Sequence, residues 1–407
     1  MNPRQVDEAV PAARDFVDFQ NQELQSLIRK REFALLHDLT APDSDTRYVT
    51  GLTHVNKSPE DVSRRIRQFS THEDFIDLFD SVTLLEEQQD HRRLRYSVRI
   101  DIPLLTLDVE FVLDYRRLGD GQWIWSCRSG DLNRYQGRIE VLPSEQEGSN
   151  LCVTSCMDLS GASWILNTVL WAQPDLKVTL PVTMNSILLH GFHAELEDDP
   201  LAVPDGTEPS DPSAPSLDGI GVDVSRLESV LNRGTCFVFH PRERVTTSDG
   251  SFDLLYTTGF RKLEDSHGTA RDELSNFESY SSFINQVDRV TQTEQDDSIR
   301  SEWFFKLGMG ILSLTVSFTI DYWWKNERCL MFELIDGKFD VIAGSMEWHT
   351  AGETETVFCI SSGSYLVNDS SRVNQLASMI PYREIFMGVT LSTVILEESQ
   401  QWFEENQ

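Results

Sequence analysis

The strongest constraint on the fold of this chain is an internal repeat. The segment "FVLDYRR" (residues 111–117) ends a stretch of alternating apolar residues, and "FTIDYWW" (residues 318–324) does the same 207 positions later in a chain of 407 residues. "FSTHEDFI" (69–76) matches "FESYSSFI" (277–284) with an offset of 208. A length of 407 residues also suits two domains better than one small core. The sequence therefore predicts one fold that occurs twice.

A change of composition marks the middle of the chain. Residues 197–219 are dense in Pro, Asp and Ser and poor in large apolar side chains, which is typical of a solvated linker. We therefore predict a helical leader (1–46), a first domain (47–198), an acidic Pro- and Ser-rich linker (199–221), a second leader (222–254) and a second domain (255–407). Pro181 and Pro381, 200 positions apart, are each expected to open the last helix of a copy, which implies a shorter preceding loop in the second copy.

Each copy has the pattern of a strand, two short helices, a run of antiparallel strands and a final helix. Ser58 and Pro59 are residue types that favour a helix N-cap and the first helical position. In the strands that follow, apolar residues such as Tyr96 and Val98 alternate with polar ones, so that one face of the sheet is apolar. We expect a curved sheet that packs this face on the final helix.

The order of these elements and a hairpin motif of the form GxLxxxxGxxxLxP resemble START-like (SRPBCC) domains of the polyketide cyclase and coenzyme Q-binding protein type. In the first copy the motif positions are held by Gly130, Leu132, Gly137 and Pro143. The second copy keeps Gly337, Phe339 and Gly344 but has His349 near the proline position. The resemblance covers about residues 50–198 and 255–400. It implies an α+β fold of two tandem helix-grip domains, each a curved antiparallel sheet wrapped around a long C-terminal helix.

The resemblance also implies a ligand cavity between the apolar face of each sheet and its final helix. The cavity-lining candidates are Tyr96, Val98, Ile100, Val109, Phe111, Leu113, Trp164, Met184 and Ile187 in the first copy, and Phe305, Leu307, Val316, Phe318, Ile320 and Met387 in the second. Because a core and a pocket use the same residue types, these side chains either line a cavity or pack directly on the helix. Trp164 belongs to the most apolar stretch (162–192), which could be a gate over the cavity or a patch that touches a membrane or a delivery partner. We favour the interpretation of an ordinary helix packed on the sibling domain, because no basic residue flanks residues 164–171.

Composition restricts the partners of the chain. A formal net charge of −31 disfavours contact with nucleic acid and with anionic lipid headgroups. The sequence has no run of about 18 or more uncharged apolar residues, and its N-terminus lacks the apolar core of a secretory signal. We therefore expect a cytoplasmic protein without stable membrane insertion. The six cysteines show no CxxC pair and are expected to be small core residues.

Three functions fit these observations. The first is non-covalent binding, as a carrier or by sequestration, of a hydrophobic small molecule such as a lipid, an isoprenoid quinone or an aromatic polyketide, with no cofactor. The second is an enzyme of the aromatase/cyclase kind, which needs polar groups in the cavity. Its candidates by position are Arg134, Tyr135, Ser155, Tyr382 and Arg383, none with an assigned role. The third is a pseudo-dimeric scaffold in which the second copy has lost its pocket.

Two pairs of histidines are regularly placed. His190 and His193 share one helical face with Glu195 close by, a spacing compatible with metal binding. No further ligand is identified, so we expect a solvated pair at a helix end and no metal. His37 and His240 occupy corresponding places after the two leader strands. Each is either a proton carrier near the pocket or, as we favour, a strand-end residue satisfied by a neighbouring backbone group.

The face of the sheet opposite the apolar one differs between the copies. The first copy carries alternating charges there, at Arg95, Arg99, Asp108, Glu110, Asp114 and Arg116. These charges predict cross-strand ion pairs on a solvated convex surface. The second copy has Trp323 and Trp324 where the first has two arginines. We interpret this face of the second domain either as the place where the copies meet or as the site of a protein partner.

Overall fold

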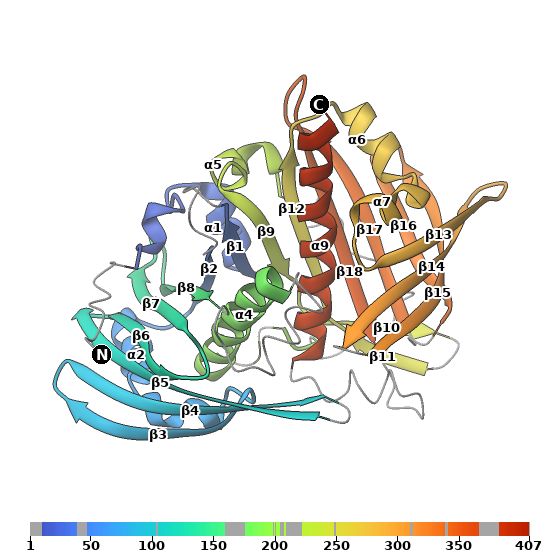
Figure 1. The fold of residues 1–407 in the computed structure, drawn as a ribbon. Helices are drawn as coiled ribbons and strands as arrows, with labels where there is room; N and C mark the ends of the chain where they lie inside the picture. The colour runs from blue at the N-terminus through green and yellow to red at the C-terminus, as the bar shows by residue number, and fades with distance from the viewer. Residues whose placement is uncertain are drawn as a thin grey trace.

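The computed structural model describes residues 10–38, 47–102, 105–158, 176–197, 199, 201–203, 207–208, 222–247, 250–309, 312–337, 341–365 and 382–406. In these residues the chain forms two halves with the same order of elements (Figure 1). Each half is a curved antiparallel sheet with one long helix on its concave face. The predicted α+β fold of two tandem helix-grip domains is therefore confirmed.

The first half contains one long helix and eight strands among its described residues. Its elements are η1 (Ala13–Asp15), α1 (Gln22–Ile28), β1 (Glu32–His37), β2 (Tyr48–Val55), α2 (Pro59–Ile66), η2 (Phe69–Asp74), β3 (Phe79–Gln88), β4 (His91–Ile102), β5 (Leu105–Gly119), β6 (Gln122–Gly130), β7 (Arg134–Pro143), β8 (Ser149–Asp158) and α4 (Leu176–Leu196).

The second half repeats this order and adds a short hairpin, β10–β11. Its described elements are η3 (Val224–Leu227), α5 (Glu228–Leu231), β9 (Gly234–Phe239), β10 (Glu243–Thr247), β11 (Gly250–Leu254), β12 (Tyr256–Leu263), α6 (His267–Leu274), η4 (Phe277–Ser279), α7 (Tyr280–Phe283), β13 (Val287–Glu294), β14 (Ile299–Met309), β15 (Leu312–Asn326), β16 (Cys329–Asp336), β17 (Val341–Thr350), β18 (Thr356–Tyr365) and α9 (Arg383–Asn406).

Local sequence signals explain where α2 begins. The Ser58 side chain accepts a hydrogen bond from the backbone N–H of Asp61 at 3.2 Å, and Pro59 is the first helical residue. The cap satisfies one of the backbone N–H groups that a helix start leaves without a partner. Ser266 caps α6 in the same way in the second half, through the backbone N–H of Thr269. The two halves thus share this start signal.

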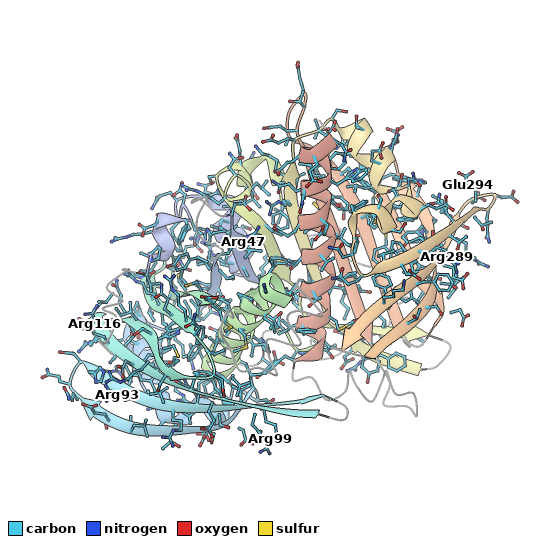
Figure 2. All side chains as sticks on the ribbon, viewed as in Figure 1. Arg47, Arg93, Arg99, Arg116, Arg289 and Glu294 are labelled. Carbon is cyan, nitrogen blue, oxygen red and sulfur yellow. The ribbon has the colours of Figure 1, made fainter. Side chains whose placement is uncertain are left out.

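The hairpin β4–β5 separates apolar from charged residues, as predicted. Tyr96 pairs with Phe111 across the two strands, and both side chains are buried. On the other face Arg93 donates a hydrogen bond to Asp114, and Arg99 Nε donates one to Asp108 at 3.0 Å. Figure 2 shows Arg99 pointing away from α4. Cross-strand charge pairs on the convex surface are therefore confirmed.

The two halves join through a continuous sheet. Among the described residues it has 16 strands in the order β13-β14-β15-β16-β17-β18-β12-β9-β1-β2-β8-β7-β6-β5-β4-β3. At its centre β1 pairs antiparallel with β9, and His37 lies opposite Gly234. A Cβ on Gly234, whose φ is 151°, would lie 1.9 Å from the carbonyl oxygen of Leu36, so only glycine permits this close approach. Each leader segment therefore contributes a central strand to the sheet.

The helices α4 and α9 lie side by side on the same face of the sheet (Figure 1). Two glycines of the sheet identify their equivalent positions. A Cβ on Gly51 would meet Asn185, and a Cβ on Gly259 would meet Ser392. These helical residues are 207 positions apart, which is also the offset between the strands.

The prediction that Pro181 and Pro381 open equivalent helices is therefore wrong. Pro181 lies inside α4, which already includes Leu176, and Pro381 lies outside the described residues. The implied difference in loop length disappears with it. Proline favours a first helical turn but is not confined to it, so its position was a poor marker of the helix start.

The convex face is covered in two places. At the junction, α1 and α5 pack on β1 and β9, with Leu24, Leu27 and Val230 buried there. In the second half the hairpin β10–β11 packs over Trp323, which its own domain therefore partly covers. Trp324, the next residue along the strand, lies on the opposite, concave face, where it is 40% exposed and packs beside the buried Trp348. The prediction that these tryptophans mark where the copies meet is wrong, because the copies meet through β1, β9, α4 and α9. Trp324 was also wrongly expected on the convex face, since neighbouring strand residues point to opposite faces. A protein partner on the convex face of the second domain stays a prediction.

Two further expectations concern the environment of the chain. None of the helices in the described part is long and apolar enough to cross a membrane. Five cysteines are buried, as expected of small core residues, and Cys127 is half-buried. Most of the predicted linker lies outside the described residues, although Leu201 at its start is buried beside Phe239 and Ile385.

Candidate functional site

A cavity lies in the first half between the concave face of the sheet and α4. Strands β3 to β8 form most of its wall, η2 adds one side chain and α4 closes it. The lining residues are His72, Phe79, Tyr96, Phe111, Leu113, Tyr115, Trp125, Tyr135, Ile139, Val153, Leu188 and Phe192. Its volume is about 10 Å³, close to the size that admits one water molecule. Aromatic side chains therefore occupy most of the space between the sheet and the helix.

The rings of the cavity pack on one another in ordered geometries. The rings of Tyr96 and Phe111 are stacked, with centroids 5.5 Å apart and an interplanar angle of 14°. Tyr135 meets Phe111 edge to face at 5.9 Å and Trp125 at 5.7 Å. Such offset and edge-to-face contacts are favourable for aromatic pairs. The wall therefore offers flat ring surfaces at defined angles.

The polar groups of the cavity are neutral. The hydroxyls of Tyr96 and Tyr115 lie 2.9 Å apart, and burial raises the pKa of both, as it does that of Tyr135. Burial lowers the pKa of His72 to about 3, although a hydrogen bond to the carbonyl of Ile66 opposes this shift. The lining residues include no Asp, Glu, Lys or Arg. The cavity therefore suits an uncharged molecule and has no group that titrates near neutral pH.

The candidates of the first half fall into three groups. Tyr96, Phe111 and Leu113 line the cavity. Four others belong to the same hydrophobic core without lining the cavity, namely Val98, Val109, Ile187 and the partly buried Met184. The side chain of Ile100 and the whole of Trp164 lie outside the described residues.

The candidates of the second half lie on the concave face of its sheet. The rings of Phe305 and Phe318 stack at 5.3 Å, and Val316 and Ile320 are buried. Met387 is half-buried on α9. The side chain of Leu307 lies outside the described residues.

The positions that correspond to the first cavity carry side chains of different sizes in the second half. With the offset of 207 to 208 residues, Tyr280 corresponds to His72 and Trp303 to Tyr96. The rings of Tyr280 and Trp303 meet at 5.4 Å, and the Tyr280 hydroxyl donates a hydrogen bond to the carbonyl of Leu274. At other positions the second half has the smaller side chain, with Phe332 for Trp125, Ile342 for Tyr135 and Ser399 for Phe192.

Several lining residues were not among the candidates predicted from the sequence. Leu188 and Phe192 follow the candidate Met184 at intervals of four positions on α4, so helical periodicity was a usable signal for them. Trp125 lies on β6, opposite Tyr115 of β5, and strand alternation was the signal there. His72 gave no such signal, because only the packing of η2 against α4 brings its ring to within 5.1 Å of the Phe192 ring.

The histidines of α4 form a buried polar cluster with Glu32 of β1. Glu32 Oε1 accepts hydrogen bonds from His190 Nδ1 at 3.1 Å and from His193 Nδ1 at 3.0 Å. Burial alone raises the pKa of Glu32, but the two histidines lower it to about 2. Burial alone lowers the pKa of His190, but Glu32 raises it above its usual value. The cluster therefore acts as a buried ion pair.

The prediction of a solvated histidine pair is accordingly wrong, because β1 of the leader covers it. Glu195 is not part of the cluster; it accepts a hydrogen bond from Arg65 at 2.7 Å. Within the described residues, no group of three or more His, Cys, Asp or Glu is arranged to hold a metal ion. In the first half the acidic residue is on a strand and its basic partners are on the helix. In the second half the acidic residue is on the helix, since Glu397 of α9 pairs with Arg261 of β12.

His37 and His240 occupy equivalent buried positions at the junction. Their Nε2 atoms lie 3.0 Å from Thr50 Oγ1 and 2.8 Å from Thr258 Oγ1, respectively. Burial is the main cause that lowers the pKa of each imidazole to about 3. The positive charge of a nearby arginine, Arg233 for His37 and Arg31 for His240, lowers it further. Each ring thus bonds a threonine hydroxyl and not the backbone group that we favoured. His240 Nδ1 also accepts a hydrogen bond from Arg31 Nε at 3.3 Å, whereas the buried His37 Nδ1 makes no hydrogen bond among the described residues. A neutral ring outside the cavity is a poor proton carrier near neutral pH.

The polar candidates for an enzyme do not converge. Tyr135 lines the cavity, whereas the Ser155 hydroxyl accepts a hydrogen bond from Asn185 beneath α4. Tyr382 lies outside the lining and accepts a hydrogen bond from the backbone N–H of Asp77. Arg134 does not belong to the lining, and the side chain of Arg383 is not described.

The fold and the site define a tandem helix-grip protein whose first domain contains an aromatic cavity. No protein-family model matches the chain, and a search of the curated proteins finds no match. Among solved structures the chain is similar to a Thermus thermophilus protein, TTHA0849, with 18% identity, a TM-score of 0.31, and coverage of 37% of this chain and 96% of that one. It is also similar to the di-domain ARO/CYC StfQ from the steffimycin biosynthetic pathway, with 8% identity, a TM-score of 0.29, and coverage of 88% and 98%.

A START superfamily protein from Mycobacterium smegmatis is similar with 13% identity and a TM-score of 0.27, over 36% of this chain and 98% of that one. The helix-grip fold of the chain follows from its strand order and from the helix on each concave face, which are observed directly.

Proposed function

We propose that the first domain binds a neutral hydrophobic small molecule non-covalently, as a carrier or by sequestration, in the cavity beneath α4. The observation that carries this proposal is the lining, which combines aromatic rings with a few neutral polar atoms and no charged side chain. Pockets for small molecules are commonly apolar clefts of this kind. A lipid, an isoprenoid quinone or an aromatic polyketide belongs to the ligand classes that such a lining accepts.

Binding requires side chains to move, because about 10 Å³ is far below the volume of any such ligand. The Phe192 ring of α4 meets Phe75 and His72, which lie at the end of η2. Phe79 begins β3 directly after this segment. We therefore propose that the ligand enters between α4 and the segment 72–79 and displaces Phe79 and Phe192.

An aromatase/cyclase-type enzyme is the alternative, and His72 with the three tyrosines is the observation in its favour. General acid–base catalysis works best with a pKa near the operating pH. Burial moves the pKa of His72 far below that range and those of Tyr96 and Tyr115 above their usual values. These shifts favour binding over proton transfer.

A cavity-filling variant tests the proposal. Leu113→Phe adds a ring inside the first cavity, and Ile320→Phe makes the same kind of change at the equivalent buried position of the second half. We expect the neutral fluorescent probe N-phenyl-1-naphthylamine to bind the wild type and Ile320→Phe. Leu113→Phe should bind it about tenfold more weakly or not at all, which corresponds to about 1.4 kcal/mol.

Thermal denaturation checks that both variants are folded. The same binding by Leu113→Phe and the wild type would contradict a site in the first cavity. Mass spectrometry of an organic extract of the purified protein provides an independent test. An apolar compound that accompanies the wild type but not folded Leu113→Phe would identify the ligand class.

A further inference from the structure

Trp125 holds a fixed position in the wall of the cavity. It lies on β6 between Tyr115 of β5 and Gly137 of β7, and only 3% of its surface is exposed. The indole lies across Gly137, where a Cβ would come within 2.1 Å of Trp125 Cζ2. Glycine at this position leaves room for the ring, and the neighbouring tyrosines limit its rotation. The indole is therefore pre-organised.

The indole N–H of Trp125 has no acceptor. The Nε1 atom is buried and makes no hydrogen bond among the described residues, which is also true of Nε1 of Trp303 and Trp348 in the second half. An indole N–H only donates, and a buried one usually finds a partner because an unmade hydrogen bond costs stability. Because Trp125, unlike the other two, lines the cavity, its N–H is available to a ligand that supplies an acceptor.

The remaining polar atoms specify the charge of that ligand. In the pair Tyr96–Tyr115 one hydroxyl donates to the other, so one phenolic proton stays available to a ligand. His72 Nε2 lies 3.4 Å from a carbonyl oxygen, which only accepts, so this nitrogen carries the proton of the neutral ring. Among the described residues no cation lines the cavity to compensate a carboxylate or a phosphate, and an unpaired charge is expensive to bury.

From these contacts we propose that the ligand is a neutral ring compound with at least one carbonyl oxygen, and that this oxygen accepts a hydrogen bond from Trp125 Nε1–H. Trp125 is then the residue that distinguishes a ketone or quinone from a hydrocarbon of the same shape. The inference rests on the proposed binding function of the first domain. It goes beyond it by excluding fatty acids and phosphorylated lipids as ligands.

A pair of matched probes tests the inference with the full chain. 1-Indanone and indane have nearly the same shape and differ by one carbonyl oxygen. By calorimetry, the wild type should bind indanone about threefold to tenfold more tightly than indane, as expected for one neutral hydrogen bond. Trp125→Phe removes the donor and should abolish this preference while it leaves the affinity for indane nearly unchanged. Trp123→Phe, on the same strand but outside the lining, should keep the preference.

A spectroscopic measurement on the wild type covers the case in which Trp125→Phe does not fold. With ¹⁵N-labelled tryptophan, one indole N–H resonance should shift downfield on addition of indanone but not of indane. Equal affinities for the two probes, or no such shift, would overturn the role of Trp125 and leave the binding function intact. Binding of neither probe would count against the binding function itself. Preferential binding of indane-2-carboxylate would overturn the assignment of a neutral ligand.

Discussion

The buried cluster of Glu32, His190 and His193 makes the sharpest prediction about stability. Replacement of Glu32 by Gln keeps the size of the side chain and removes its charge. A fall of the Glu32 pKa from 4.5 to about 2 on folding corresponds to about 3 kcal/mol in favour of the native state. The Glu32→Gln variant should lose roughly this amount of stability, because it leaves two buried imidazoles without their carboxylate.

The sign of the pH dependence follows from the two pKa directions. Because the pKa of Glu32 is lowered on folding, the ionised carboxylate stabilises the folded state fully above pH 4.5. This stabilisation is lost as the pH falls toward about 2. Because the pKa of His190 is raised on folding, the protonated imidazole stabilises the folded state fully below pH 6.5. This stabilisation is lost as the pH rises through the pKa of His190 in the folded protein. The difference in unfolding free energy between the wild type and Glu32→Gln should therefore be largest between pH 4.5 and 6.5.

Urea unfolding followed by tryptophan fluorescence measures this difference. At about pH 5.5 Glu32→Gln should unfold at a clearly lower urea concentration than the wild type, and the gap should narrow on the alkaline side. Glu195→Gln on the same helix as the two histidines is the matched control. Its partly exposed ion pair with Arg65 should contribute only about 0–1 kcal/mol. If Glu32→Gln lowers stability by the same amount at every pH, or no more than the control does, the cluster is not a buried ion pair.

Two other perturbations test the packing of the first half. Gly137→Val places a side chain where the Trp125 ring lies and should destabilise the protein by about 1–3 kcal/mol in thermal or urea unfolding, whereas Gly119→Ala, with nothing within 4 Å of its Cβ, should be close to neutral. Tyr382→Phe removes the acceptor for the backbone N–H of Asp77 and should cost about 0.5–1.5 kcal/mol. It should also speed hydrogen exchange at Asp77; an unchanged exchange rate there would contradict this link between the halves.

Much of the fold follows from local patterns in the sequence. The alternation around Tyr96 and Phe111 identified the buried face of β4 and β5, and the Ser58–Pro59 signal identified the start of α2. The steady offset near 207 residues identified two copies. These features are readable because strand alternation, helix capping and duplication each leave a mark within a short segment. The same alternation selected Tyr96, Phe111 and Leu113 as lining residues.

Other features depend on contacts between distant segments. Glu32 contacts His190, which lies 158 positions away in the sequence, and no local pattern in either segment predicts this contact. The leader strands β1 and β9 carry no mark that they pair with each other and join the two sheets. The place of Pro181 inside α4 likewise became clear only from the contacts of the helix with the sheet. Such pairings are decided by the registry and packing of the whole sheet.

The sequence by itself therefore determined the class of the fold, its duplication and the apolar face on which a ligand can lie. Only the tertiary structure decided that the halves share one sheet, that α4 covers a buried ion pair, and that the cavity of the first half is small and lined by neutral polar atoms. The physical reason is that periodicity records which way a side chain points, whereas the volume left between a sheet and a helix depends on how all the side chains from both sides fit together.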